Sequence, residues 1–270
     1  PGQDVSRVRG TVSVASGDAV TLVLEGPGLA PRTQTLAAGG EFEFDTAGME
    51  KGDAWLTVTA GRETKKVRIR NLPETGRRMA WIADGNLVVN GRPTLRRNIY
   101  ADGYLQGLMF KERYDADLAN FWMTPECGDT VGLEMDRLIP GLERREGVRD
   151  VKPCAEYLAK IDAAIEANRD RDFTAYYLSD EPECRNISPV YLKHVYDYVA
   201  ERDPYHPVFS ATRGGKAYIE CVDWAETHPY LNCRVPDENG VRAYGRHPNE
   251  VGRFLDAFEA WDRPDKCIGF

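Results

Sequence analysis

The stretch FTAYYLSDEPE, residues 173–183, decides the fold class, because it reads as a buried strand that ends in two adjacent acids. Aromatic and apolar residues dominate its first half, and Asp180 and Glu181 follow immediately before Pro182. Two carboxyl groups are costly to bury without partners, so an acid pair at the end of such a strand favours a functional site over packing, with an acidic loop as the alternative.

Amphipathic helices and further apolar strands alternate on both sides of this stretch. Apolar residues at three- and four-residue spacing predict helices over 153–169, 188–202 and 248–261, and a shorter one over 105–115. Ser188 is the expected N-cap of the second helix. The expected strands besides 173–179 are RRNIY (96–100), LANFWMT (118–124), RLIPG (137–141), PVFSA (207–211), VDWAETH (222–228) and KCIGF (266–270). This alternation predicts βα units and a parallel sheet.

Seven strand candidates with helices between them predict a (β/α)8 barrel, in which the C-terminal strand ends form the active-site face. Such barrels usually take about 250 residues, and about 190 follow residue 82 here. We therefore expect an incomplete barrel whose seventh strand contains the last residues. An open doubly wound sheet is the alternative, but neither GxGxxG nor GxxxxGK[ST] occurs in the sequence.

The N-terminal part follows a different pattern. Residues 5–70 hold short runs that alternate apolar and polar residues between turn residues, which predicts a small all-β sandwich of the immunoglobulin-like or fibronectin-like kind. Its single tryptophan, Trp55, fits the core as well as the surface. The polar segment 71–81 contains Pro and Gly and is the expected linker. We therefore expect a sandwich over 1–75 and a barrel over 76–270.

Composition excludes several classes of function. A hydrophobic content of 42% with 29% charged residues is typical of a folded globular chain. The net charge of −8 disfavours nucleic acid as a partner, and no apolar run approaches the roughly 18 residues of a membrane helix. The six cysteines form no CxxC pair and the four histidines no HxH pair, so we expect neither a metal nor a cofactor. Secretion or export to the periplasm after loss of a signal peptide is expected, with a cytosolic location as the alternative.

Three stretches together resemble a known family. YYLSDEPE, followed by a helix and ERDPYHPVFSAT, resembles the fourth and fifth strands of retaining glycoside hydrolases of the large (β/α)8 clan that includes β-galactosidases, cellulases and β-mannanases. LVVNGRPTLRRNIY resembles the first hairpin and strand of that clan, and VDWAETHPYLN its sixth strand. The resemblance covers about 85–270 and implies a carbohydrate substrate.

The resemblance also implies roles for individual residues. Glu181 matches the general acid/base, and Asp180 stands where the clan usually has an Asn that binds the sugar 2-hydroxyl, so an acceptor is kept and an amide donor lost. The clan's nucleophile, a Glu at the end of the seventh strand, is expected just after Phe270. His228 and Tyr230 match a stretch that lines the substrate cleft.

Other residues at or near the predicted strand ends are candidate sugar contacts: Tyr100, Arg97, Trp122, Glu126 and Glu226. Aromatic rings suit the apolar face of a pyranose, although a barrel tryptophan also serves packing. Each of the two glutamates could instead be a member of a buried ion pair. Either one could also be the second catalytic acid, the partner of Glu181.

Retaining glycoside hydrolysis needs two carboxyl groups about 5–5.5 Å apart, one protonated and one ionised. Glu181 among aromatic strand neighbours suits the protonated role, because partial burial raises a carboxyl pKa. A non-catalytic carbohydrate-binding or scaffold protein is the main alternative function. A metal-dependent hydrolase using Asp180, Glu181 and His228 is another.

Overall fold

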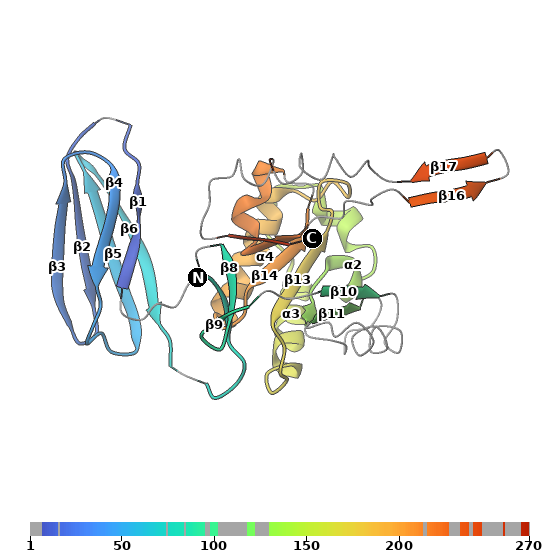
Figure 1. Cartoon of the computed structure of the whole chain (residues 1–270), viewed down its shortest axis with the longest axis horizontal. Helices are drawn as coiled ribbons and strands as arrows, with labels where there is room; N and C mark the ends of the chain where they lie inside the picture. Colours follow the sequence, from blue (N-terminus) through green and yellow to red (C-terminus); the bar gives the residue numbers. More distant parts are fainter. Residues whose placement is uncertain are drawn as a thin grey trace. The chain divides into compact units, whose positions relative to one another are not determined.

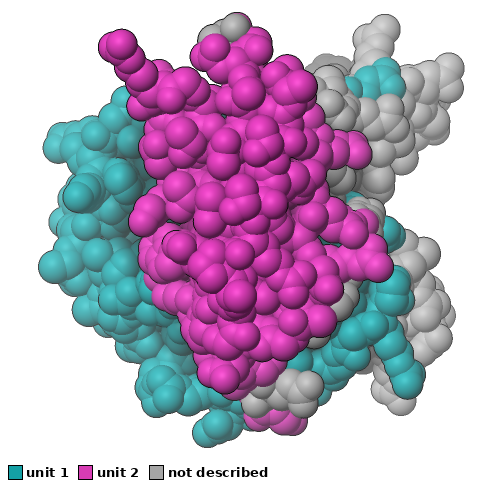
Figure 2. Space-filling model, turned by 90° about the vertical axis from the view of Figure 1, so that its left-hand side faces the viewer, with its two compact units in different colours: residues 1–2, 77–270 teal, residues 3–76 magenta. Residues whose placement is uncertain are grey.

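The computed structural model describes residues 7–15, 17–73, 75–83, 85–94, 98–101, 118–121, 130–212, 215–226, 233–237, 240–244, 256 and 266–269. For 98–101, 118–121, 233–237, 240–244 and 267–269 it describes the backbone alone. The chain divides into two compact units, residues 3–76 and residues 77–270 with 1–2 (Figure 2).

The first unit is all β within its described residues. A four-stranded antiparallel sheet has the order β3-β2-β5-β6, and β1 pairs with β4 in a second sheet. Their bounds are β1 (Arg7–Val12), β2 (Val20–Gly26), β3 (Leu29–Leu36), β4 (Gly40–Asp45), β5 (Gly52–Ala60) and β6 (Glu63–Asn71). Alternate residues of β2, Val20, Leu22 and Leu24, are fully buried in one core with Phe42 and Phe44, as period-2 patterning dictates. Trp55 lies outside that core and is 43% exposed.

The second unit is built on a parallel sheet. Its strands are β12 (Thr130–Gly132), β13 (Ala175–Asp180), β14 (Val208–Ala211), β15 (Trp224–Glu226) and β18 (Cys267–Gly269), and they lie in chain order. Figure 1 labels β13 and its neighbour β14. Two earlier strands, β10 (Asn98–Ala101) and β11 (Leu118–Phe121), form a parallel pair, and β11 contacts β12. A doubly wound sheet reverses its strand order at a switch point. The described parallel strands show no such reversal.

Two predicted helices are confirmed, α3 (Ala155–Ala167) and α4 (Pro189–Arg202). Ser188 caps α4 by accepting hydrogen bonds from the backbone N–H groups of Val190 and Tyr191, which satisfies two donors that a helix start leaves unpaired. The buried stripe of α4, which includes Leu192, Val195 and Val199, packs in one core with Tyr176 and Leu178 of β13.

The opposite face of the sheet is covered by a small antiparallel sheet. Its strands β7 (Ala80–Ala83), β8 (Asn86–Val89) and β9 (Arg92–Pro93) include the hairpin that the sequence predicts near residue 90. Ile82 and Val89 share a core with Tyr177, Phe209 and Trp224 of the parallel strands. We call this face, which carries Tyr177, Phe209 and Trp224, the inner face.

One predicted strand is wrong. Residues 137–141 form no strand: α2 (Met135–Leu138) runs through the first half, and Gly141 takes a positive φ of 82° in the turn that follows. The strand at this place is the three-residue β12, too short to leave a periodic signal. The predicted helix 105–115 lies outside the described residues, as does almost all of 248–261.

The remaining described elements lie outside the parallel sheet. They are the π-helical turn η1 (Glu143–Gly147), the 3-10 helix η2 (Lys216–Cys221), and the antiparallel pair β16 (Cys233–Asp237) and β17 (Gly240–Tyr244).

Candidate active site

A β-bulge decides which face of the sheet Asp180 occupies. Tyr177 pairs with Phe209, but the next pair is Ser179 with Ser210, so Leu178 is skipped. Side chains alternate between faces along a strand, and one extra residue reverses that alternation. Asp180 consequently pairs with Ala211, a member of the inner-face core. Without the bulge, Asp180 would face the helices.

A row of aromatic rings lies beneath Asp180 on the inner face. The ring centroids of Tyr177 and Phe209 are 4.7 Å apart, and those of Phe209 and Trp224 are also 4.7 Å apart. The Tyr177 hydroxyl donates to Asp180 Oδ1 at 3.2 Å. Tyr177 therefore links the aromatic row to the acid and limits the movement of its carboxylate.

Glu181 directly follows β13 and has a left-handed backbone conformation, φ 40°. Its N–H donates to the Ala211 carbonyl at 2.8 Å, and its own carbonyl accepts from the N–H groups of Cys184 (2.9 Å) and Arg185 (3.3 Å). A positive φ is strained for a residue with a side chain, and such strain collects at functional sites. The hydrogen bonds on both sides of Glu181 hold this conformation in place.

Arg185 connects two carboxylates at this end of the sheet. Its Nη2 lies 3.0 Å from Asp180 Oδ2, and its Nη1 lies 3.3 Å from each Glu143 carboxylate oxygen. Burial lowers the pKa of the Arg185 guanidinium, but the two carboxylates outweigh this effect and raise it. Arg185 is therefore a fixed positive charge beside Asp180.

Glu134 is a site residue that the sequence does not reveal. It follows β12 and is only 7% exposed. Burial raises the pKa of Glu134 to about 7, against the opposing influence of Arg137 and Arg185. The sequence signal for Glu134 is the apolar run VGL (131–133) directly before an acid, which is the pattern of a strand end. The prediction placed the strand at 137–141 instead, so Glu134 was not at a predicted strand end.

Glu226 also lies at this edge of the sheet. It ends β15, is buried, and pairs with Ala211, which in turn pairs with Asp180. Adjacent strands are about 4.8 Å apart, so the backbones of Asp180 and Glu226 are roughly 10 Å apart on the same face. The structure thus brings together Asp180, Glu181 and Glu226 from the predicted set.

The other predicted site residues are not tested by the structure. Arg97, Trp122, Glu126, His228 and Tyr230 lie outside the described residues, and of Tyr100 only the backbone, in β10, is described. Within the described residues no group of three or more His, Cys, Asp or Glu side chains could hold a metal ion. No helix in that part of the chain is long and apolar enough to cross a membrane.

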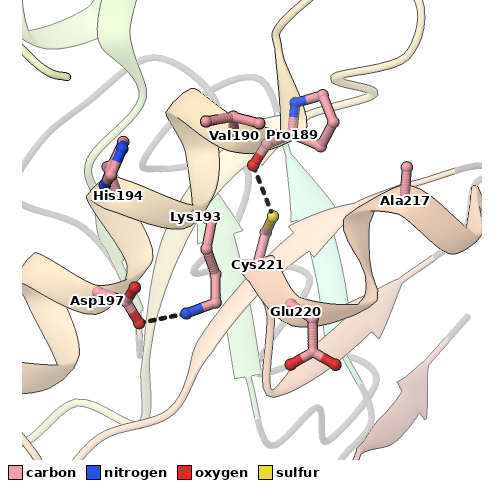
Figure 3. Close-up of a pocket in the computed structure, with 8 residues that line it drawn as sticks. All are labelled: Pro189, Val190, Lys193, His194, Asp197, Ala217, Glu220 and Cys221. Atoms are coloured by element: carbon pink, nitrogen blue, oxygen red, sulfur yellow. Dashed lines mark hydrogen bonds and ion pairs between the residues drawn. The ribbon is translucent and has the colours of Figure 1, made fainter. Parts of the chain in front are cut away.

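A cavity of about 310 Å³ lies away from the strand ends, between α4 and η2 (Figure 3). Pro189, Val190, Lys193 and Cys221 are among its lining residues. The Cys221 thiol donates to the Pro189 carbonyl at 3.3 Å, and burial raises the pKa of this thiol to about 12. A thiol with such a pKa is a poor nucleophile, so this cavity does not offer the chemistry of the strand ends.

Comparisons with known proteins find distant matches among solved structures. No family model and no curated protein matches the chain. A GH2 β-galacturonidase from Eisenbergiella tayi, bound to galacturonate, has a TM-score of 0.41 at 13% identity and is aligned over 97% of this chain and 52% of its own. A Ruminococcus gnavus β-glucuronidase has a TM-score of 0.41 at 11% identity over 97% and 51%. A family 39 glycoside hydrolase from Bacteroides cellulosilyticus has 0.35 at 14% identity over 90% and 58%.

All three are glycoside hydrolases, and the chain spans between half and three fifths of their lengths.

Proposed function

We propose that the chain is a glycoside hydrolase that cleaves a glycosidic bond in an oligo- or polysaccharide, with Glu181 as the general acid/base of a retaining mechanism. The observation that carries the proposal is the position of the Asp180–Glu181 pair. The bulge turns Asp180 to the inner face, and the strained backbone of Glu181 ends the strand there. In parallel α/β folds, ligands bind at the C-terminal ends of the strands.

The proposal includes the architecture around the site. The strands in chain order favour a (β/α)8 barrel over 76–270, and the N-terminal residues 1–75 would form an immunoglobulin-like sandwich. Export to the periplasm or outside the cell belongs to the same proposal.

Each acid has a separate role in this mechanism. Asp180, fixed by Arg185 and Tyr177, would accept a hydrogen bond from a sugar hydroxyl. Glu181 would protonate the leaving oxygen and then deprotonate the attacking water. Glu226, two strands away on the same face, would contact the sugar from the other side. The nucleophile would follow β18, as the family resemblance implies.

The test is Glu181→Gln in the full-length protein. Loss of general acid catalysis should reduce kcat/KM by about 10² to 10⁴-fold on oligosaccharides with poor leaving groups. The reduction should be much smaller on 4-nitrophenyl glycosides, whose phenolate leaves without protonation, and azide should restore turnover of the glycosyl-enzyme. Glu166→Gln, at an exposed acid paired with Arg169, is the matched control and should behave as wild type.

Two results would overturn the assignment. Equal losses on both substrate types without azide rescue would remove Glu181 as acid/base. If the wild-type protein binds sugars but hydrolyses none of the tested glycosides, the carbohydrate-binding alternative is favoured.

A further inference from the structure

Arg185 belongs to the same turn as Glu181. Its backbone N–H donates to the Glu181 carbonyl at 3.3 Å, while its guanidinium lies 3.0 Å from Asp180 and 3.3 Å from Glu143. A movement of this guanidinium would therefore release Asp180, the neighbour of Glu181 in the acid pair. The structure shows it bound to Asp180.

Glu134 is a third carboxyl group beside this bridge. The backbone N–H of Leu133 donates to the Tyr177 carbonyl at 2.7 Å, which fixes the end of β12 against β13. Glu134 Oε2 lies 3.5 Å from Arg137 Nη1. A Cβ atom on Gly132 would lie 2.1 Å from that same nitrogen. The Arg137 guanidinium therefore lies directly against Gly132, in the space that a side chain at this position would take.

Ionisable groups face Glu134 from each element that packs around it. They are Arg137 of α2, Asp180 of β13, Arg185 of the following turn, Glu143 of η1 and Tyr157 of α3. Tyr157 is fully buried and its hydroxyl donates to the Leu133 carbonyl at 2.6 Å. Two arginines thus serve three carboxyl groups: those of Asp180, Glu143 and Glu134.

We propose that Glu134 is a positioning residue for the Asp180–Glu181 pair: protonated, it leaves Arg185 bound to Asp180, and ionised, it competes with Asp180 for Arg185. This inference rests on the function proposed above. It adds to that function an ionisable group outside the acid pair, which controls the placement of Asp180.

Charge balance supports this role. With Glu134 protonated, two guanidinium groups face the two carboxylates of Asp180 and Glu143. Ionisation adds a third carboxylate to a largely buried cluster, where an unbalanced charge is costly. The Glu134 pKa of about 7 places this change near neutral pH. We therefore expect kcat/KM to fall above neutral pH partly because Asp180 loses its fixed position.

The first experiment compares pH profiles of wild type and Glu134→Gln. Glutamine has nearly the shape of the protonated acid but cannot ionise, so the alkaline decline of kcat/KM should begin about one pH unit higher in the variant. Arg185→Lys keeps the positive charge but cannot contact Asp180 and Glu143 at the same time as the guanidinium does. This variant should therefore lower kcat more than it changes KM. Glu166→Gln again serves as control and should keep the wild-type profile. An unaltered alkaline limb in Glu134→Gln would overturn the inference.

The second experiment does not depend on activity. In protein labelled with ¹³C at the glutamate carboxyl carbon, the Glu134 resonance, assigned by its absence in Glu134→Gln or by elimination, should titrate near pH 7. Arg185 lowers the pKa of Glu134, so Arg185→Gln should move this titration to higher pH.

These two readouts separate the possible failures. If no glycoside is hydrolysed but the titration near pH 7 responds to Arg185→Gln, the proposed function fails while the coupled cluster stands. If hydrolysis is observed but Glu134 titrates as an ordinary glutamate, or does not respond to Arg185→Gln, the inference is wrong and the proposed function stands. Should Glu134→Gln fail to fold, the titration of Arg185→Gln decides the matter.

Discussion

Glu181 occupies a backbone conformation that residues with side chains rarely adopt. A left-handed φ costs such a residue about 1 kcal/mol, and Asn tolerates it better than Glu. We predict that Glu181→Asn raises the free energy of unfolding by about 0.5–1 kcal/mol, measured by urea denaturation. Glu181→Gln keeps the unfavourable backbone preference and is the matched control, for which we expect no gain. Equal stability of the two variants would show that the turn stores no strain at this residue.

Asp203, at the opposite end of the sheet, should make stability depend on acid pH. It accepts hydrogen bonds from the Tyr176 hydroxyl (2.8 Å), His206 Nδ1 (2.9 Å) and the Tyr205 N–H (3.0 Å). Burial raises the pKa of Asp203, but these donors, His206 foremost, lower it below its ordinary value of 3.8. A carboxyl whose folded-state pKa is depressed stabilises the fold above its unfolded-state pKa, and this stabilisation is lost as the pH falls through the folded value.

Asp203→Asn should therefore cost about 1–3 kcal/mol at pH 7. The cost should shrink below about pH 4, because wild type then loses the same charge. Urea denaturation at a series of pH values measures the difference. Asp162→Asn, at an exposed acid bound to Tyr198 and Arg202, should cost less than about 1 kcal/mol at pH 7. A pH-independent cost for Asp203→Asn would contradict the linkage.

Helix α4 presents one buried side and one exposed side, and the two should respond differently to truncation. Leu192 is fully buried, whereas Val190 is 46% exposed. Leu192→Ala should lower the free energy of unfolding by about 2–5 kcal/mol through lost burial and a residual cavity. Val190→Ala should change it by less than about 0.5 kcal/mol. Comparable effects in denaturant titrations would mean that the helix does not pack as described.

The elements that the sequence predicts well are those with a repeated signal. Helix α4 has an apolar stripe, a capping Ser188 and a proline in its first turn. These three signals are independent, and all of them are consistent with a helix that begins at Pro189. Strand β13 is long, aromatic and bounded by Pro182. The prediction over 137–141 was wrong because the apolar pair Leu138 and Ile139 is typical of a short strand. In the structure α2 includes Leu138, and the Arg137 side chain lies against Gly132.

The site was only partly predictable for a related reason. Adjacent acids at the end of a strand are visible in the sequence, so Asp180 and Glu181 could be singled out. The bulge at Leu178 leaves no sequence signal, because it depends on the pairing with β14. Glu134 owes its raised pKa to burial and neighbouring charges, which arise from η1 and the turn after β13. Such long-range contacts are not encoded in local patterns.

At the scale of the whole molecule, each unit encloses its own hydrophobic core. Phe42 belongs to the core of residues 3–76, where it lies opposite Gly10 of β1, and Leu192 belongs to that of residues 77–270. Units with separate cores can unfold separately. We predict two transitions in scanning calorimetry of the full chain. Phe42→Ala, which should cost about 3–5 kcal/mol, should lower one midpoint, and Leu192→Ala the other. A single transition lowered by both variants would contradict this prediction.

The bulge in β13 also affects how this protein can evolve and be engineered. Because the skipped Leu178 sets the face that Asp180 occupies, the position of this acid depends on the number of residues before it as well as on its identity. A one-residue insertion or deletion between Tyr177 and Asp180 would reverse the alternation and turn the acid toward the helices, although Asp180 itself is retained. Substitution libraries would not sample this change. A homologue whose strand is one residue longer or shorter would therefore keep the Asp-Glu-Pro motif and lose the position of its aspartate.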